Sequence, residues 1–233
     1  MVLIPKEASG IVSELSKQTI LIYGRAKIGK STLCSKFESP LFLATEAGLN
    51  HLAVHKVNIL SWKTFLDVCS EIAQKKHDRK TIVIDTIDNL VVLCSEYICK
   101  ENGISHVSEL PMGKGWHLVT SELNRTLIKL SGLPYGLVMV SHCDIETIET
   151  KTKKYNRFTI SIGGKNKNIF LNMSDMILFV DSVMNKDGEE VRCIRTKPSM
   201  NYEAGDRTGK LPELLKLDYN EIVKYFKTKK EEK

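Results

Sequence analysis

The sequence lacks the long apolar segments that would place a protein in a membrane or direct it out of the cell. No apolar run approaches the roughly 20 residues that a membrane-spanning helix needs. The N-terminal residues MVLIPKEASG also lack the basic region and long apolar segment of a secretion signal. We therefore expect a cytoplasmic protein that has no membrane partner.

Paired cysteines and clustered metal ligands are missing as well. The six cysteines form no C-x-x-C pair, which favours reduced thiols over disulfides or a zinc site. His51 and His55 lie four residues apart without a third ligand, so we interpret both as surface or packing histidines. The net charge of +6 is mildly basic, which permits nucleic-acid binding without demonstrating it.

One motif stands out among the residues that are present. Residues 20–31 read ILIYGRAKIGKS, an apolar run followed by the pattern G-x-x-x-x-G-K-S/T of a phosphate loop. Its glycines turn backbone N–H groups inward, where they bind phosphate oxygens of ATP. We expect Lys30 to reach the β and γ phosphates and Ser31 to ligate Mg²⁺. The nucleotide-binding residues are then Gly24, Arg25, Ala26, Lys27, Ile28, Gly29, Lys30, Ser31 and Thr32.

Short apolar runs alternate with helical periodicity from residue 20 onward. We predict helices at 31–38, 62–76, 87–102 and 115–131, and strands at 20–23, 41–45, 57–60, 81–85, 136–141 and 176–181. Such alternation predicts one α/β domain with a mainly parallel sheet flanked by helices. The turn at 185–188 leads to a further strand at 190–197, which predicts an antiparallel C-terminal hairpin. Residues 1–18 would be an N-terminal extension and 227–233 a charged tail.

Ligands of such sheets bind at the carboxyl ends of the strands, where this sequence has polar residues. Asp85 ends the apolar run TIVID, as in a Walker B segment, and is expected to orient Mg²⁺. Glu46 ends LFLATE and would position the attacking water, the alternative being a solvent-facing helix cap. His142 follows VMVS and is interpreted as a γ-phosphate sensor. Asp88, one turn after Asp85, either supports the Mg²⁺ site from behind or is an ordinary helix N-terminal acid, and we favour the latter.

Residues 144–170 interleave basic and aromatic side chains. This composition suits single-stranded DNA, because cations bind the phosphates and aromatic rings stack on bases. The alternation within the segment also suits a plain exposed β-hairpin with charged edges, and the two readings are evenly balanced. Residues 110–116 form a second Gly/Lys-containing loop that could reach the same strand. The candidate DNA-binding residues are Lys151, Lys153, Lys154, Tyr155, Arg157, Phe158, Lys165 and Lys167.

The order GRAKIGKS, LFLATE, TIVIDT, VMVSH and Gly163-Gly164 resembles the RecA-like core ATPases over residues 18–215. Within them the chain is most similar to the phage-encoded Sak group of RecA-related single-strand annealing proteins, whose endings resemble residues 195–213. The resemblance implies a RecA-like P-loop fold and an ATP-dependent homo-oligomer, a ring or a filament, that binds single-stranded DNA in recombination. It also implies nucleotide between subunits, a single-strand-binding protein as partner, and a host-cell cytoplasm if the protein is phage-encoded.

The same resemblance implies roles for individual residues. Glu46 resembles the catalytic glutamate of related ATPases, and His142 falls where recombinases have a sensor glutamine. Residues 145–170 take the place of the second DNA-binding loop. Arg207, Arg195 and Lys197 are candidates for cations supplied to a neighbour's γ phosphate. About 18 residues precede the first strand, so we expect the oligomerisation element of full recombinases to be missing.

Three other functions remain open at this point. One is a helicase or helicase-loader motor, and another is a nucleotide-dependent assembly protein with little turnover. The third is a small-molecule P-loop kinase, which is weakened because no Arg-rich lid is evident. An ATPase assay with and without single-stranded DNA distinguishes these possibilities.

Overall fold

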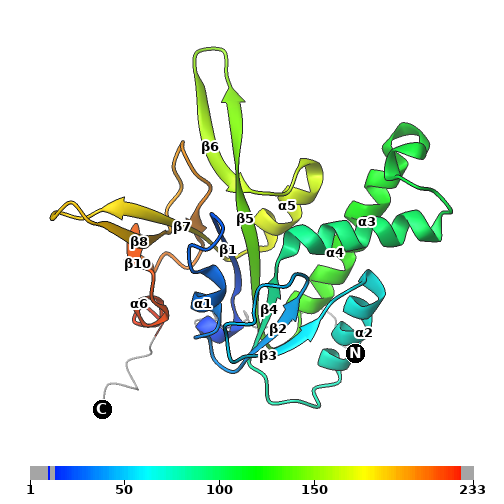
Figure 1. The fold of residues 1–233 in the computed structure, drawn as a ribbon, viewed down its shortest axis with the longest axis horizontal. Coiled ribbons are helices and arrows are strands. Elements are labelled where there is room, and N and C mark those ends of the chain that lie inside the picture. Colours follow the sequence, from blue (N-terminus) through cyan, green and yellow to red (C-terminus); the bar gives the residue numbers. More distant parts are fainter. Residues whose placement is uncertain (1–9, 11–13, 227–233) are drawn as a thin grey trace.

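The structure is a computed structural model, and it describes residue 10 and residues 14–226. Its described strands join in one sheet in the order β10-β8-β7-β1-β5-β4-β2-β3, with β6 paired to β5 and β9 to β7 (Figure 1). The pairs among β7, β1, β5, β4, β2 and β3 are parallel, whereas β8, β10, β6 and β9 pair antiparallel. The strands are β1 Thr19–Gly24, β2 Pro40–Ala44, β3 His55–Asn58, β4 Thr81–Asp85, β5 Gly136–Glu149, β6 Lys154–Ile160, β7 Met176–Met184, β8 Glu190–Arg195, β9 Gly205–Asp206 and β10 Leu214–Lys216.

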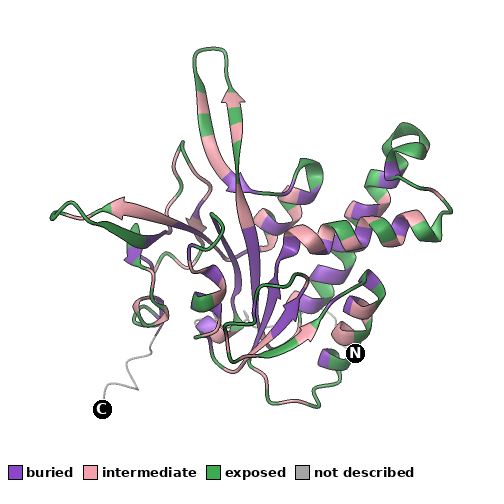
Figure 2. Ribbon diagram, viewed as in Figure 1, coloured by how far each residue is buried: buried purple, intermediate pink, exposed green. Residues whose placement is uncertain are grey.

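Helices cover both faces of the sheet, as the alternation of side chains along β1 requires. Leu21 and Tyr23 pack into one apolar core with α2, α3, α4 and α5, while Ile20 and Ile22 pack into the other with α1 and α6. All six residues of β1 are buried, and so are residues 136–141 of β5 and most of residues 176–180 of β7 beside it (Figure 2). The helices are α1 Lys30–Cys34, α2 Trp62–Ala73, α3 Ile87–Glu101, α4 Lys114–Ser131, α5 Gly164–Met173 and α6 Tyr219–Val223, with short 3₁₀ helices at Leu15–Lys17, Val107–Glu109 and Pro111–Gly113.

The predicted fold class is confirmed: a mainly parallel sheet lies between helices, and β7 and β8 form the C-terminal antiparallel hairpin. Several boundaries differ from prediction. Helix α1 ends at Cys34 rather than residue 38, and the chain continues through turns and bends at residues 35–39 into β2. Strand β3 begins at residue 55 rather than 57. Of the described residues, none forms a helix both long and apolar enough to cross a membrane.

Strand β5 differs most from its predicted span of 136–141. It continues to Glu149 and pairs with β6, so the segment 144–170 is a β-hairpin followed by α5 and not one long loop. Residues 136–141 are buried in the sheet, whereas the part beyond Cys143 is largely exposed. Figure 1 shows the β5–β6 hairpin projecting beyond the rest of the sheet. The segment is therefore a hairpin, and DNA binding by it stays a prediction.

Candidate nucleotide-binding site

The phosphate loop connects the buried strand β1 to α1, and its two glycines are fixed by the geometry around them. A Cβ on Gly24 would lie 2.4 Å from the carbonyl oxygen of Val180 on the neighbouring strand β7, which no side chain tolerates. Gly29 has φ +111°, a conformation that L side chains rarely adopt. The loop shape therefore depends on glycine at both positions of the motif.

Lys30, the first residue of α1, is buried and turned back into this loop. Its Nζ donates hydrogen bonds to the carbonyl oxygens of Gly24 at 2.8 Å and Arg25 at 3.0 Å. Burial lowers the pKa of Lys30, although the nearby carboxylates of Asp85, Asp88 and Glu46 act in the opposite direction. The ammonium group is thus held at the loop, where it can compensate the negative charge of a phosphate chain.

Ser31 and Asp85 form the pair predicted to hold Mg²⁺. The Ser31 hydroxyl donates to Asp85 Oδ2 at 2.7 Å, and burial of Asp85 at the end of β4 raises its pKa. The buried Oγ1 of the adjacent Thr86 has no hydrogen-bond partner among the described residues. Serine and aspartate oxygens beside an unsatisfied hydroxyl fit Mg²⁺, which takes few protein ligands and completes its shell with water and phosphate oxygens. No group of three or more His, Cys, Asp and Glu that could hold a metal occurs in the described part of the chain.

The loop opens into a cavity of about 430 Å³ that brings together most of the predicted catalytic residues. On its far wall, Glu46 Oε1 lies 3.5 Å from His142 Nε2, and Glu46 Oε2 lies 3.5 Å from the Asn89 amide. Both side chains are more than a third exposed, so a water molecule can reach them. The cavity is lined by Ala26, Lys27, Gly29, Lys30, Ser31, Thr32, Glu46, Gly48, His51, Asp85, Thr86 and His142.

Asp88 has a different environment from the one interpreted from the sequence. Its carboxylate accepts hydrogen bonds from the Ser141 hydroxyl at 3.0 Å and from the backbone N–H of His142 at 3.2 Å. Burial raises its pKa, and these two hydrogen bonds partly offset that effect. Asp88 therefore fixes the end of the buried part of β5 to α3, and it is not a plain helix N-terminal acid. The sequence offered one signal for this, its position three residues after Asp85.

The tip of β2 is fixed to the tip of β4 in a similar way. The Thr45 hydroxyl accepts a hydrogen bond from Thr86 N and donates one to Thr86 O, both at 2.8 Å, and Thr45 N donates to Asp85 O at 2.9 Å. The peptide bond between Asp85 and Thr86 is cis. These contacts place Glu46, one residue beyond Thr45, next to the Asp85 strand.

The predicted trans-acting cations lie outside this cavity and have partners in the same chain. Arg195 donates to Asp181 at 2.9 Å, and Lys197 lies 3.6 Å from Asp206. Arg207 is exposed; it lies 3.7 Å from Asp175 and donates to the Asn172 carbonyl oxygen at 2.5 Å. Within the subunit, the structure does not bring these side chains to the phosphate loop. Action on a neighbouring subunit stays a prediction.

The candidate DNA-binding residues fall into two groups. Lys151, Lys153 and Lys154 are exposed at the hairpin tip, and Lys165 is exposed on α5. Lys154 also lies 3.6 Å from Glu149 across the hairpin. The less exposed candidates have intramolecular partners: Lys167 with Glu146 at 2.5 Å, Arg157 with Glu203 at 3.0 Å and with the Tyr155 ring. The Phe158 ring stacks on Phe179 at a centroid distance of 5.5 Å. Phe158 thus packs against the core, and this contact argues against its predicted role of stacking on bases.

Sequence reasoning missed three residues of the site: Gly48, His51 and Thr86. They lie in loops after β2 and β4 and line the cavity only because those strands end side by side. His51 is in a turn and His55 begins β3, so the two do not share a helix face.

Comparison with known proteins agrees with this geometry. Residues 16–208 match the model of a family described as an AAA domain, AAA_24. The chain belongs to this family. Its phosphate loop, buried aspartate and cavity make it a P-loop NTPase of the AAA domain family.

Two further similarities are more distant. The SPbeta prophage-derived uncharacterized protein YorG of Bacillus subtilis (strain 168) is 26% identical over 142 residues, which are 58% of this chain and 44% of that protein. The match thus spans less than half of the relative's length. The crystal structure of flagellar accessory protein FlaH from Methanocaldococcus jannaschii gives a TM-score of 0.46 at 11% identity, covering 85% of this chain and 84% of that chain. A likeness at this level does not bear on function.

Proposed function

We propose that this protein hydrolyses ATP and binds single-stranded DNA in phage-type recombination or strand annealing, with the nucleotide at interfaces between subunits. The observation that carries the proposal is the continuity of β5. Its buried half ends beside the phosphate cavity at His142, and its exposed half forms the projecting hairpin with β6 (Figure 1). A contact between His142 and a γ phosphate would therefore act on the hairpin through one rigid strand.

In this proposal the residues of the cavity divide the chemistry between them. Lys30 binds the β and γ phosphates, and Ser31 and Asp85 hold Mg²⁺, which supplies positive charge at the phosphates. Glu46 orients the attacking water and accepts its proton. His142, within 3.5 Å of Glu46, reports whether the γ phosphate is present.

The composition of the hairpin supports single-stranded DNA as the partner. Three lysines, Lys151, Lys153 and Lys154, are exposed at its tip, and Tyr155 follows Lys154 on β6, where its ring contacts Arg157. Such a pairing of cations with an aromatic face suits a flexible strand whose bases are free to stack. The prophage origin of the relative YorG fits a phage recombination setting.

The first test is ATP hydrolysis measured with and without single-stranded DNA, with Lys30→Ala as the inactive control. Stimulation by DNA supports the proposal. Turnover that DNA does not change would favour a nucleotide-dependent assembly protein, and phosphate transfer to a nucleoside would favour a kinase. Turnover in Lys30→Ala equal to that of the wild type would remove the phosphate loop from the reaction.

The second test concerns the hairpin. We expect Lys151/Lys153/Lys154→Ala to weaken DNA binding and to lower the salt dependence of log affinity by ~0.7 per lost phosphate contact, roughly 2 in all. Tyr155→Ala should cost about 1–3 kcal/mol with little change of slope. Fluorescence anisotropy across a salt series measures both effects. Arg157 is left intact because its pairing with Glu203 makes it structural.

A matched control removes three exposed lysines elsewhere, Lys63, Lys76 and Lys129, and so changes the net charge equally. If this variant and the hairpin variant lose affinity to the same extent, binding depends on overall charge and the hairpin is only a charged surface feature.

A further inference from the structure

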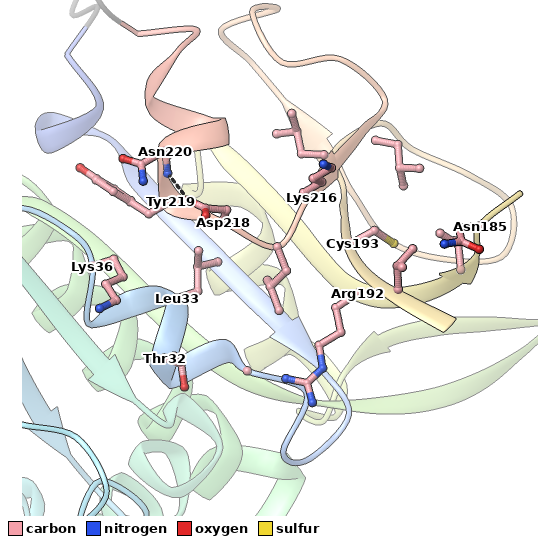
Figure 3. A pocket seen from close by; sticks show the side chains of 16 residues that line it. Thr32, Leu33, Lys36, Asn185, Arg192, Cys193, Lys216, Asp218, Tyr219 and Asn220 are labelled. Atoms are coloured by element: carbon pink, nitrogen blue, oxygen red, sulfur yellow. Dashed lines mark hydrogen bonds between the residues drawn. The ribbon is translucent and has the colours of Figure 1, made fainter. Parts of the chain in front are cut away.

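A second, larger cavity adjoins the phosphate cavity. It measures about 1130 Å³ and lies between α1, strand β8 and the corner where β10 leads into α6 (Figure 3). The two cavities share Gly29 and Thr32, so they meet at the phosphate loop. This volume exceeds the roughly 300–1,000 Å³ typical of small-ligand sites. The larger cavity therefore has room for a small-molecule ligand beside the phosphate loop.

Arg192 stands at the junction of the two cavities. Its Nη1 lies 3.4 Å from the position that a Cβ on Gly29 would occupy, and Figure 3 shows the guanidinium directed toward the loop and Thr32. Among the described residues no carboxylate lies within ion-pair distance of Arg192, whereas Arg195 on the same strand is paired with Asp181. Arg192 is therefore the cation of β8 that is available to an anion at the loop.

The walls of the larger cavity suit a sugar and a base. Leu33 and Leu217 provide apolar surface, and a Leu217 methyl group approaches the Gly29 Cβ position to 3.0 Å. Asn220 and Lys36 add polar groups that can hydrogen-bond to a ligand. An apolar surface with a few polar side chains is the usual composition of a small-molecule site.

The orientation of the nucleotide follows from the two cavities together. Glu46 and His142 lie in the smaller cavity. If the γ phosphate of the nucleotide points toward them, the nucleoside end of the same nucleotide lies on the other side of Gly29. That side is occupied by Arg192 and the larger cavity. The phosphate next to the ribose then passes the guanidinium.

We propose that Arg192 binds the nucleotide held by the phosphate loop of its own subunit, at the phosphate next to the ribose, and that the cavity beyond it holds the nucleoside. This rests on the proposed binding of ATP and extends it. Arg192 acts in cis and binds the ligand, whereas Arg207 is predicted to act on a neighbour. The corner at 214–220 completes the site.

The test compares the affinities of ATP and inorganic tripolyphosphate, measured by calorimetry, for the wild type and variants. We expect Arg192→Ala to weaken both ligands about tenfold to a hundredfold, as for loss of a charge-assisted hydrogen bond. The affinities of Arg192→Lys for both ligands should lie between those of the wild type and Arg192→Ala, because lysine keeps the charge without the planar fork. Lys186→Ala, which removes an exposed charge from the β7–β8 turn, serves as control and should bind as the wild type does.

A second variant tests the cavity. Asn220→Trp fills it with a large ring and should weaken ATP at least tenfold while leaving tripolyphosphate unchanged, which also shows that the variant is folded. Equal ATP affinity in Asn220→Trp and the wild type would overturn the nucleoside assignment. Wild-type affinity in Arg192→Ala, or recovery of hydrolysis on mixing Arg192→Ala with Lys30→Ala subunits, would overturn the role in cis. If the wild type itself binds no ATP, the proposed function fails first.

Discussion

Two buried charges, Lys30 and Asp85, dominate the site at the scale of single residues. Burial acts against both: it lowers the pKa of Lys30 and raises that of Asp85. The ionised Asp85 therefore destabilises the fold at neutral pH, and this penalty disappears as the pH falls through its folded pKa toward the ordinary value of 3.8. The charged Lys30 has the opposite dependence, since its penalty disappears as the pH rises toward 10.5. In the proposed function, phosphate and Mg²⁺ would supply the partners that both charges need.

Asp85→Asn should accordingly stabilise the nucleotide-free protein while impairing Mg²⁺-dependent ATP binding. The amide oxygen can still accept the Ser31 hydrogen bond, and the desolvated charge is gone. Thermal unfolding at pH 7–8 measures the gain, at about 2–4 °C per kcal/mol. The difference from the wild type should shrink as the pH is lowered toward 4. The exposed Asp67→Asn is the control, and a melting temperature of Asp85→Asn at or below the wild-type value would contradict the prediction.

Glu46→Gln should separate binding from turnover. Glutamine keeps the shape of the side chain but cannot accept the proton of the attacking water, so hydrolysis should fall about a hundredfold or more at unchanged ATP affinity. Single-turnover hydrolysis and calorimetry measure the two quantities. Turnover within a factor of two of the wild type would assign Glu46 to the alternative role of a solvent-facing acid.

At the scale of elements, the end of the buried part of β5 is fixed by Asp88 from α3. The carboxylate bonds Ser141 and the N–H of His142, residues 53 and 54 positions away in the sequence. This contact sets the point where β5 leaves the sheet and becomes the hairpin. Helix α3 thus contributes to the position of the proposed sensor without touching the nucleotide.

Asp88→Ala should uncouple the hairpin from the site. Loss of the carboxylate leaves a buried N–H without its acceptor, which should lower the free energy of unfolding by about 1–3 kcal/mol. DNA stimulation of hydrolysis should fall, whereas ATP affinity should stay within about twofold because Lys30 and Ser31 are untouched. Denaturant unfolding and ATPase assays measure these effects. Asp88→Asn retains one acceptor oxygen, so its stability and its stimulation by DNA should lie between those of the wild type and Asp88→Ala. If DNA stimulates Asp88→Ala as strongly as the wild type, Asp88 has no coupling role.

At the scale of the whole molecule, the described surface presents cations that the subunit's own phosphate cavity does not use. Arg207 is exposed and its contact with Asp175 is long, at 3.7 Å. Exposed ion pairs contribute only about 0–1 kcal/mol, so this one breaks at little cost. To reach a neighbouring subunit, Arg207 would exchange this ion pair and its hydrogen bond to the Asn172 carbonyl oxygen for new contacts.

Arg207→Ala should lower hydrolysis by about a thousandfold if it acts on a neighbour's γ phosphate. Mixing it in equal amounts with Lys30→Ala should restore activity, because about a quarter of the interfaces then combine an intact loop with an intact arginine. The readout is the ATPase rate across mixing ratios under conditions of subunit exchange. Unmixed variants at the same total concentration are the controls, and absence of recovery would exclude action between subunits.

Local sequence patterns were sufficient to predict much of the candidate site. The glycines of the phosphate loop, the apolar strand that ends at Asp85 and the turn at 185–188 each lie within a few residues, where backbone conformation depends on the residues themselves. The same holds for the long helices α2, α3 and α4, whose periodicity predicted them to within a few residues. The continuation of β5 was left open, because alternation suits a DNA-binding segment and a hairpin equally.

The sequence by itself therefore determined the phosphate loop, the core strands and long helices, and the carboxylates at the strand ends, but not β6, α5, β9 or β10. Only the tertiary structure decided the pairing of Asp88 with Ser141, the packing of Phe158 on Phe179 and the position of Arg192 beside Gly29. These contacts join segments that are 21 to 163 residues apart in the sequence. They depend on strand order and on how helices pack against the sheet, and periodicity within one segment carries no information about either.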